Sequence, residues 1–146
     1  MALNPRFSKA YFNLGNLYLK IKDYRQAIYY NQMAIEHNPD YLKAYINLGI
    51  AQFRLKELDQ AQATFEKALL KNPALAGIHR NLGIIFFEKN KNSDKAILHF
   101  QESIRLAPNQ PEVEQIQSLI EALKRQSQKS GWSNNLPRYC HVNLFR

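Results

Sequence analysis

The hexapeptide AYFNLG at residues 10–15 recurs as AYINLG at 44–49 and as IHRNLG at 78–83. The closing glycine of each copy lies 34 residues after the one before it. The dipeptide Asn-Pro recurs with the same period at 38–39 and 72–73, and Pro108 ends the third copy with one extra residue. A fixed period of this length is the signature of a repeat architecture, in which each repeat is one small structural unit. We therefore interpret the chain as a series of tandem units.

Each copy contains two stretches with apolar residues three and four positions apart, the spacing of a helix with one apolar face. Short polar turns at 22–23 and 56–57 join the two helices, and proline ends each copy because it cannot continue a helix. In the first copy the expected stripes are Tyr11, Leu14, Leu17 and Tyr18 on the first helix, and Ala27, Ile28, Ala34 and Ile35 on the second.

Small residues mark the place where the two helices of a pair come closest. We expect Gly15 of the first helix to face alanine on the second. A larger side chain at this contact would force the helices apart, and such overpacking costs about 1–3 kcal/mol. The alanine pairs are Ala27 and Ala34, then Ala61 and Ala68, then Ala96 with Ser103 in the second place.

This pattern resembles the tetratricopeptide repeat, whose consensus W-x2-L-G-x2-Y…A-x3-F…P spans 34 residues. The consensus has aromatic residues where this chain has Asn31 and Gln52, and the turn at 90–94 has one extra residue. The resemblance implies an all-α fold, namely a right-handed α-solenoid of antiparallel helix pairs. The matching positions, copy by copy, are Tyr11, Leu14, Gly15, Tyr18, Ala27 and Pro39; Tyr45, Leu48, Gly49, Ala61, Phe65 and Pro73; His79, Leu82, Gly83, Phe86, Ala96, Phe100 and Pro108.

We predict repeats at 8–41, 42–75 and 76–110, followed by a capping helix at 111–127. The outer face of that helix is polar, as the end of a solenoid requires. Residues 1–7 are interpreted either as the end of a preceding repeat or as a cap on the first helix, and residues 128–146 as a disordered basic tail. The apolar face of the capping helix consists of Val113, Ile116, Leu119, Ile120 and Leu123.

The distribution of charge along the sequence argues against a nucleic-acid binder. The net charge is +8, and five basic residues follow Glu121, after which the sequence has no acidic residue. A nucleic-acid binder clusters its basic residues on a folded face, so nucleic acid is not an expected partner. The sequence has no apolar run long enough for a membrane helix and no signal peptide. With Cys140 as the single cysteine, a cytoplasmic location is predicted.

The resemblance implies that the first helices line a concave face, where residues outside the core would contact a peptide. Asn13, Asn47 and Asn81 occupy the same position in the three copies. One amide can bond both a C=O and an N–H group of an extended peptide, so the three could form a ladder; the alternative is that they bond locally. The predicted peptide-binding residues are Lys9, Phe12, Asn13, Asn16, Lys43, Ile46, Asn47, Ile50, Arg80, Asn81 and Ile84.

Hydrogen bonds alone do not repay the cost of association, so apolar pockets are also expected. One variant of the family grips a C-terminal carboxylate with basic and asparagine side chains. Asn16 and Asn47 match its two asparagines, but the positions of its basic residues hold Phe12, Gly77 and Asn81, so this grip is not expected here. The pockets are expected from Phe12, Ile46, Ile50, Phe53, Ile84 and Phe87.

No catalytic motif, cofactor site or metal site is predicted. His37, His79, His99 and His141 do not pair with Cys, Asp or Glu at zinc spacing, and His79 is expected to replace a packed tyrosine. The predicted function is a module that binds an extended peptide segment of a protein partner. The alternative is the substrate-recruiting arm of a larger enzyme, such as a glycosyltransferase. A further hypothesis is self-association, with residues 136–145 of the tail occupying the groove.

Overall fold

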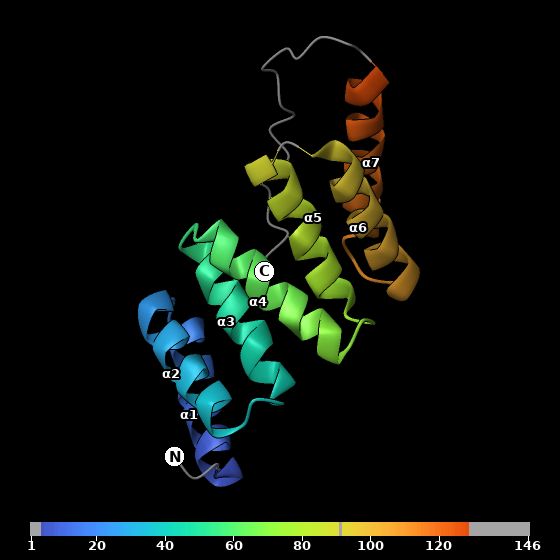
Figure 1. Cartoon of the computed structure of the whole chain (residues 1–146). Coiled ribbons are helices and arrows are strands. Elements are labelled where there is room, and N and C mark those ends of the chain that lie inside the picture. Colours follow the sequence, from blue (N-terminus) through green and yellow to red (C-terminus); the bar gives the residue numbers. More distant parts are fainter. Residues whose placement is uncertain (1–3, 91, 129–146) are drawn as a thin grey trace. The chain divides into compact units, whose positions relative to one another are not determined.

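The computed structural model describes residues 4–90 and 92–128, and within these ranges it contains seven α-helices and no strand (Figure 1). The helices belong to two compact units, Met1–Ala74 and Leu75–Arg146, called unit 1 and unit 2 below. The prediction for the tail at 128–146, including its occupancy of a groove, falls almost entirely outside the described residues.

Unit 1 consists of two helix pairs. The first is α1 (Pro5–Lys20) with α2 (Tyr24–His37), and the second is α3 (Leu42–Arg54) with α4 (Leu58–Lys71). Each pair packs together, and α2 also packs against α3. An apolar face drives this packing, since short helices gain most of their stability from tertiary burial.

The ends of the unit 1 helices follow from local chemistry. Asn4 caps α1 by accepting a hydrogen bond from the backbone N–H of Arg6, and Pro5 begins the helix. Lys22 closes α1 with φ of 64°, and Lys56 closes α3 with φ of 63°. The backbone N–H of Asp23 bonds to the carbonyl of Tyr18 across that turn, and the same bonds recur at the end of α3. Both turns are Schellman caps. The left-handed backbone conformation, which is unfavourable for a lysine, therefore recurs at the same position in both repeats.

A charged contact connects the two helix pairs of unit 1. The Lys71 ammonium at the end of α4 donates to the Asp40 carboxylate between α2 and α3, at 2.7 Å. The hydrogen bond with Asp40 raises the pKa of Lys71. Lys71 also lies 5.3 Å from the centroid of the Tyr45 ring, which is cation–π distance.

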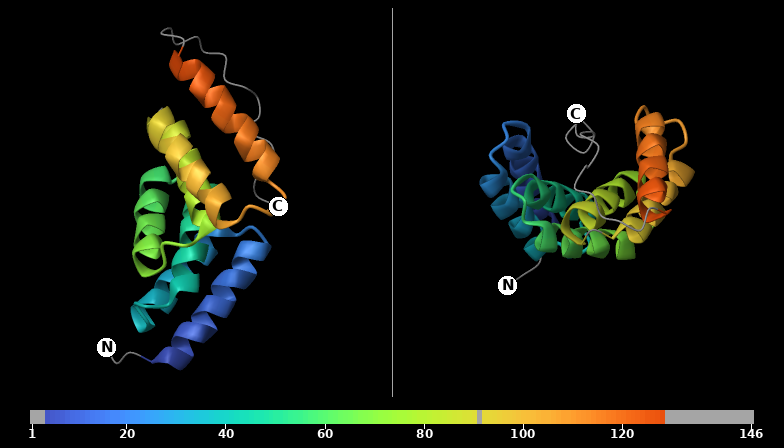
Figure 2. Two further views of the ribbon diagram at one scale, coloured as in Figure 1. Left: turned by 90° about the vertical axis from the view of Figure 1, so that its right-hand side faces the viewer. Right: turned by 90° about the horizontal axis from the view of Figure 1, so that it is seen from above.

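Unit 2 consists of α5 (Ala76–Asn90), α6 (Ser93–Leu106) and α7 (Val113–Gln128). Helix α5 packs against α6 and α6 against α7, and Figure 2 shows α7 running beside α6 in two further views. Ile116, Ile120 and Leu123 are buried, whereas the outer face of α7 is polar. Its first helical residue is Val113, two residues after the predicted start at Pro111.

The expected contact of Gly15 with alanine is wrong. A Cβ atom on Gly15 would lie 2.3 Å from Nδ2 of Asn31, and one on Gly49 would lie 2.4 Å from the Phe65 ring. The Gly83 position likewise meets Phe100. In each pair the glycine of the first helix lies against one side chain of the second helix, namely Asn31, Phe65 or Phe100. This residue follows the first alanine of the second helix by four positions. The alanines of the second helices are fully buried.

Two residues assigned to the core stripe of the first helix are exposed. Leu14 and Leu17 are 39% and 54% exposed, so the prediction that they pack inward is wrong. Their equivalents on α3, Leu48 and Ala51, are buried. The difference arises because α3 has α2 on one side and α4 on the other, whereas α1 is packed mainly against α2. None of the helices described is both long and apolar enough to cross a membrane.

Replacing Gly49 with alanine tests the close contact. Gly49→Ala should lower the free energy of unfolding by about 1–3 kcal/mol, because the new Cβ overlaps the Phe65 ring. Gly77→Ala is the matched control, since its Cβ meets nothing within 4 Å and alanine favours helix. Urea denaturation followed by circular dichroism measures both. Equal stabilities of the two variants would contradict the account.

Candidate functional site

In unit 1 the predicted peptide-binding residues lie on α1 and α3, the first helices of the two pairs. These two helices also contact each other, so their outward faces form one continuous surface within unit 1. We call this surface the first-helix face. Three of its members are exposed, namely Lys9, Asn13 and Lys43, and five are half-buried, namely Phe12, Asn16, Ile46, Asn47 and Ile50.

Phe12 joins the two helices of the first-helix face. Its ring meets Tyr41 edge to face, with 5.1 Å between centroids. Such pairs contribute about 0.5–1.5 kcal/mol beyond the area they bury. Tyr41 precedes the first residue of α3 and was not predicted to belong to the site. The aromatic pair therefore provides a fixed, half-buried apolar patch, which a peptide side chain could contact.

Asn47 has the environment expected of a ligand-binding amide. Its Nδ2 atom is buried and has no hydrogen-bond partner among the described residues. A buried polar group without a partner costs about 1–3 kcal/mol, so such groups are rare and call for an explanation. The neighbouring copy differs, because Asn13 is exposed and can bond to water. Nδ2 of Asn47 therefore makes no local hydrogen bond within the described part of the chain.

In unit 2 three predicted residues lie on α5. Asn81 and Ile84 are only 5% and 6% exposed, so the expectation that they lie outside the core is wrong. The run Gly83–Phe87 is buried throughout, and it is a nearly continuous apolar stretch of α5. Phe87 and, in unit 1, Phe53 are also buried, so neither lines an open pocket as predicted.

Two polar atoms of unit 2 are buried and lack a hydrogen-bond partner among the described residues, as Nδ2 of Asn47 does. They are Oδ1 of Asn81 and Nε of Arg80. The Arg80 guanidinium is held from one side by the Glu112 carboxylate, at 3.4 Å. Glu112 immediately precedes α7, and the repeat pattern gives no indication of this pairing. Arg80 thus keeps an unused donor, and the next residue, Asn81, keeps an unused acceptor.

The three histidines among the described residues occupy packing positions, whereas His141 lies outside them. His79 and His99 approach to 3.1 Å between their Nδ1 atoms, so one imidazole donates a hydrogen bond to the other. His99 also stacks on Phe86, and in unit 1 the equivalents of the histidine pair are the stacked Tyr11 and Tyr30. Among the residues that the structure describes, no group of three potential ligands is arranged to hold a metal ion.

Models of known families match most of the repeat region. A tetratricopeptide repeat model matches residues 8–41, and a second tetratricopeptide repeat model matches residues 46–111. A search of curated protein sequences found no match. The first match has the same bounds as the first predicted repeat.

Solved structures of tetratricopeptide repeat domains are similar to this chain. The first TPR of Spaghetti (RPAP3), bound to the HSP90 peptide SRMEEVD, has a TM-score of 0.77 at 20% identity and covers 88% of this chain and 98% of its own. The Arabidopsis OM64 TPR domain has a TM-score of 0.74 at 21% identity, and the match covers 83% of this chain and 97% of that domain. The TPR2B domain of yeast Sti1, in complex with pHsp70, has a TM-score of 0.72 at 18% identity, covering 83% and 98%. At these identities the likeness shows the fold, and the predicted all-α solenoid is confirmed.

Alanine substitutions of two asparagines in unit 1 distinguish an amide that stabilises the fold from one that is available to a ligand. Asn31→Ala should lower the free energy of unfolding by about 1–3 kcal/mol, because it removes a buried side chain whose Nδ2 donates to the carbonyl of Ala27 at 2.8 Å. Asn47→Ala should leave stability unchanged within about 0.5 kcal/mol or raise it, because Nδ2 has no partner to lose. Chemical denaturation of both variants measures this difference. A loss at Asn47 as large as at Asn31 would assign Asn47 to the fold.

Proposed function

Since the chain belongs to the tetratricopeptide repeat family, we propose that it is a protein-interaction module that binds an extended peptide segment of a partner protein through its first helices. The observation that carries the proposal is the set of buried polar atoms without partners: Nδ2 of Asn47, Nε of Arg80 and Oδ1 of Asn81. All three belong to first helices and to residues that the repeat pattern singles out.

These atoms favour a backbone ligand. Asn47 leaves a donor and Asn81 an acceptor, and a peptide backbone offers a C=O and an N–H group in every residue except proline. Recognition of this kind holds a chain without reading its sequence. Selectivity then comes from the patch of Phe12 and Tyr41 and from the exposed ammonium groups of Lys9 and Lys43, which favour acidic side chains.

The energetics bound the affinity. Each hydrogen bond contributes a net of about 0.5–1.5 kcal/mol, against association costs of about 4–15 kcal/mol. Burial of Phe53, Ile84 and Phe87 removes three of the six apolar contacts expected from sequence. A short unmodified peptide should therefore bind with a dissociation constant near micromolar, about −8 kcal/mol.

Capture from a cell extract tests the proposal. The full chain should retain a discrete set of partners that a variant with Asn13, Asn47 and Asn81 changed to alanine loses, at equal helical content by circular dichroism. Each substitution should weaken binding about two- to tenfold, as expected for one hydrogen bond. Gln32→Ala, an exposed amide on the second helix α2, is the matched control and should retain every partner. Partners kept by the triple variant would refute binding through the asparagines.

The SRMEEVD peptide, bound by the Spaghetti domain, distinguishes backbone binding from a carboxylate grip. Phe12, Gly77 and Asn81 stand at the basic positions of that grip. Converting the C-terminal carboxylate of the peptide to an amide should therefore change the dissociation constant by less than about threefold, measured by fluorescence anisotropy. A loss of about thirtyfold or more on amidation would establish a carboxylate grip and overturn this part of the proposal.

A further inference from the structure

A contact between the two helices of the third repeat joins a pair of histidines. His79 of α5 and His99 of α6 face each other with their Nδ1 atoms 3.1 Å apart. The ring of Phe86 stacks on His99, with 5.3 Å between centroids. Both imidazoles are half-buried, so part of each is accessible to solvent. Neither histidine belongs to the predicted peptide-binding residues.

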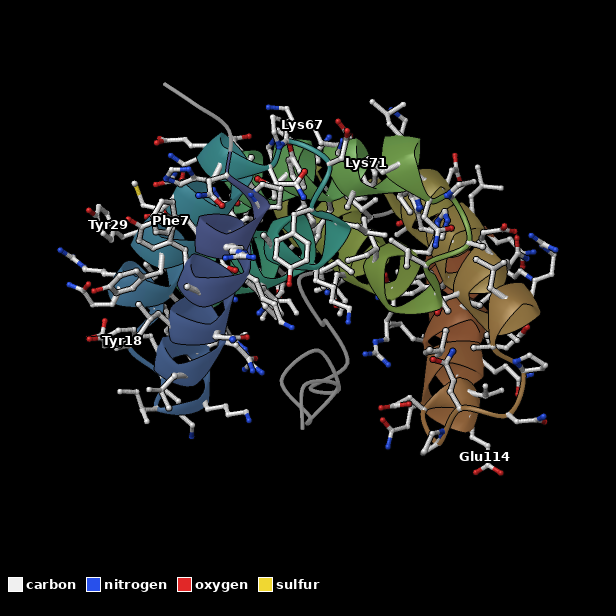
Figure 3. The ribbon with its side chains drawn as sticks, turned by 90° about the horizontal axis from the view of Figure 1, so that it is seen from below. Phe7, Tyr18, Tyr29, Lys67, Lys71 and Glu114 are labelled. Carbon is white, nitrogen blue, oxygen red and sulfur yellow. The ribbon has the colours of Figure 1, made fainter. Side chains whose placement is uncertain are left out.

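The equivalent contact in the first repeat is purely aromatic. Tyr11 and Tyr18 of α1 both stack on Tyr30 of α2, with centroids 6.4 Å and 5.2 Å apart. The side chain of Tyr18 is labelled in Figure 3, on the blue helix α1. In the second repeat the positions of the two histidines hold Tyr45 and Thr64. A helix pair therefore forms without histidine at this contact, and only the third repeat has an imidazole on both helices.

The separation of the two nitrogens is that of two ligands on one metal ion. A transition metal ion binds imidazole nitrogen at about 2.0–2.1 Å. With both Nδ1 atoms about 2.05 Å from the ion, their separation of 3.1 Å corresponds to an angle of about 98° at the metal. That angle lies between the roughly 90° of a square-planar site and the roughly 109° of a tetrahedral one. Rotation of the side chains is then sufficient to direct both lone pairs at the ion.

Neutral imidazoles are suitable ligands for such an ion. In the metal-free pair one ring donates its Nδ1–H group to the lone pair of the other ring. When the metal binds, the donor ring changes to its other neutral tautomer, with the proton on Nε2. Imidazole suits zinc, nickel and copper, and Cu²⁺ binds most tightly in this series. Water completes the coordination, since no third ligand joins the two histidines among the residues described.

The surroundings of the histidine pair carry charges of both signs. The Glu102 carboxylate, one turn after His99 on α6, accepts hydrogen bonds from Arg105 at 2.6 Å and 2.8 Å. The hydrogen bond from Arg105 is the main cause of the lowered pKa of Glu102, and both imidazoles lower it further, so the carboxylate lies within electrostatic range of them. The Lys95 ammonium adds a positive charge 5.3 Å from the centroid of Phe86. These charges oppose one another, so the imidazole lone pairs must supply the affinity.

We propose that His79 and His99 form a binding site for a divalent transition metal ion, with Cu²⁺ as the preferred ion, and that the ion connects α5 to α6. Because the two ligands come from different helices, the site exists only when the helices are packed together. An ion that binds the folded chain in preference to the unfolded chain stabilises the fold. The site thus makes the stability of this helix pair depend on the concentration of the metal.

Titration of the full chain with Cu²⁺ by calorimetry tests the proposal. The starting protein has no purification tag and carries Cys140→Ser and His141→Ala, because this thiol and imidazole are themselves copper ligands. It should bind one Cu²⁺ ion per chain. Pulsed electron paramagnetic resonance of the copper complex should detect two imidazole ligands.

Three substitutions in this protein assign the ligands. His79→Tyr and His99→Thr introduce residues that the other repeats have at these positions, so the helices should still pack. Each should weaken copper binding at least about tenfold, because one of two ligands is lost. His37→Phe, at the third of the described histidines, is the matched control and should leave the affinity and the number of imidazole ligands unchanged. Circular dichroism checks that all variants keep their helical content.

Thermal unfolding provides a readout that is independent of the spectrum. Saturating Cu²⁺ should raise the Tm of the starting protein and leave the Tm of the His79→Tyr variant unchanged. Copper binding that survives both His79→Tyr and His99→Thr would overturn the proposal. So would the absence of binding to the starting protein, since the histidine pair would then be a packing hydrogen bond only.

Discussion

The close approach of two helices at a glycine is the constraint on which the repeat depends. At Gly49 the ring of Phe65 occupies the space that a Cβ atom would need, and at Gly83 the ring of Phe100 does the same. Both rings are fully buried, so each forms the centre of its helix pair. In the first pair the smaller Asn31 takes this place and uses its Nδ2 to bond the carbonyl of Ala27. One helix pair thus has a polar centre, with Oδ1 of Asn31 left without a partner among the described residues.

This constraint also determines which residues remain available for binding. The side of α3 that carries Gly49 is taken up by α4, and another side by α2, so only the remaining side can contact a ligand. Asn47 lies at the boundary of that side, half-buried and with an unused donor. A buried group without a partner is a cost to folding, which a ligand with a complementary group would remove. Stability and binding therefore make opposite demands on the same side chain.

Sequence reasoning succeeded where a residue's role is fixed by its repeat. The period of the glycines and prolines predicted the six helices of the three repeats, because each copy has the same apolar spacing, and the apolar face that follows Pro111 predicted the seventh of the described helices. It failed where neighbours decide the outcome. Leu14 and Leu48 have the same place in the pattern, yet only Leu48 is buried, since α3 has packing partners on two sides. For Asn81, Ile84 and Phe87 burial depends on surroundings that the pattern does not specify.

The polar contacts of the site were the least predictable part. Arg80 pairs with Glu112, and Phe12 pairs with Tyr41. Neither pair joins two positions that the 34-residue pattern relates, so the pattern could not predict these contacts. Nor does a sequence reveal that an amide lacks a partner, because that depends on every group around it. The asparagine ladder could be proposed from sequence, but only the surroundings of each amide separate a binding role from a structural one.

Photo-crosslinking tests the central claim, binding through the first helices, most directly. A photoreactive amino acid would replace Lys43 on α3 or Lys67 on α4, both of which are exposed lysines of the same repeat. The account predicts crosslinks to a discrete partner from position 43 and none from position 67. Crosslinks to a discrete partner from position 67 alone would place the partner on the second helices and contradict it.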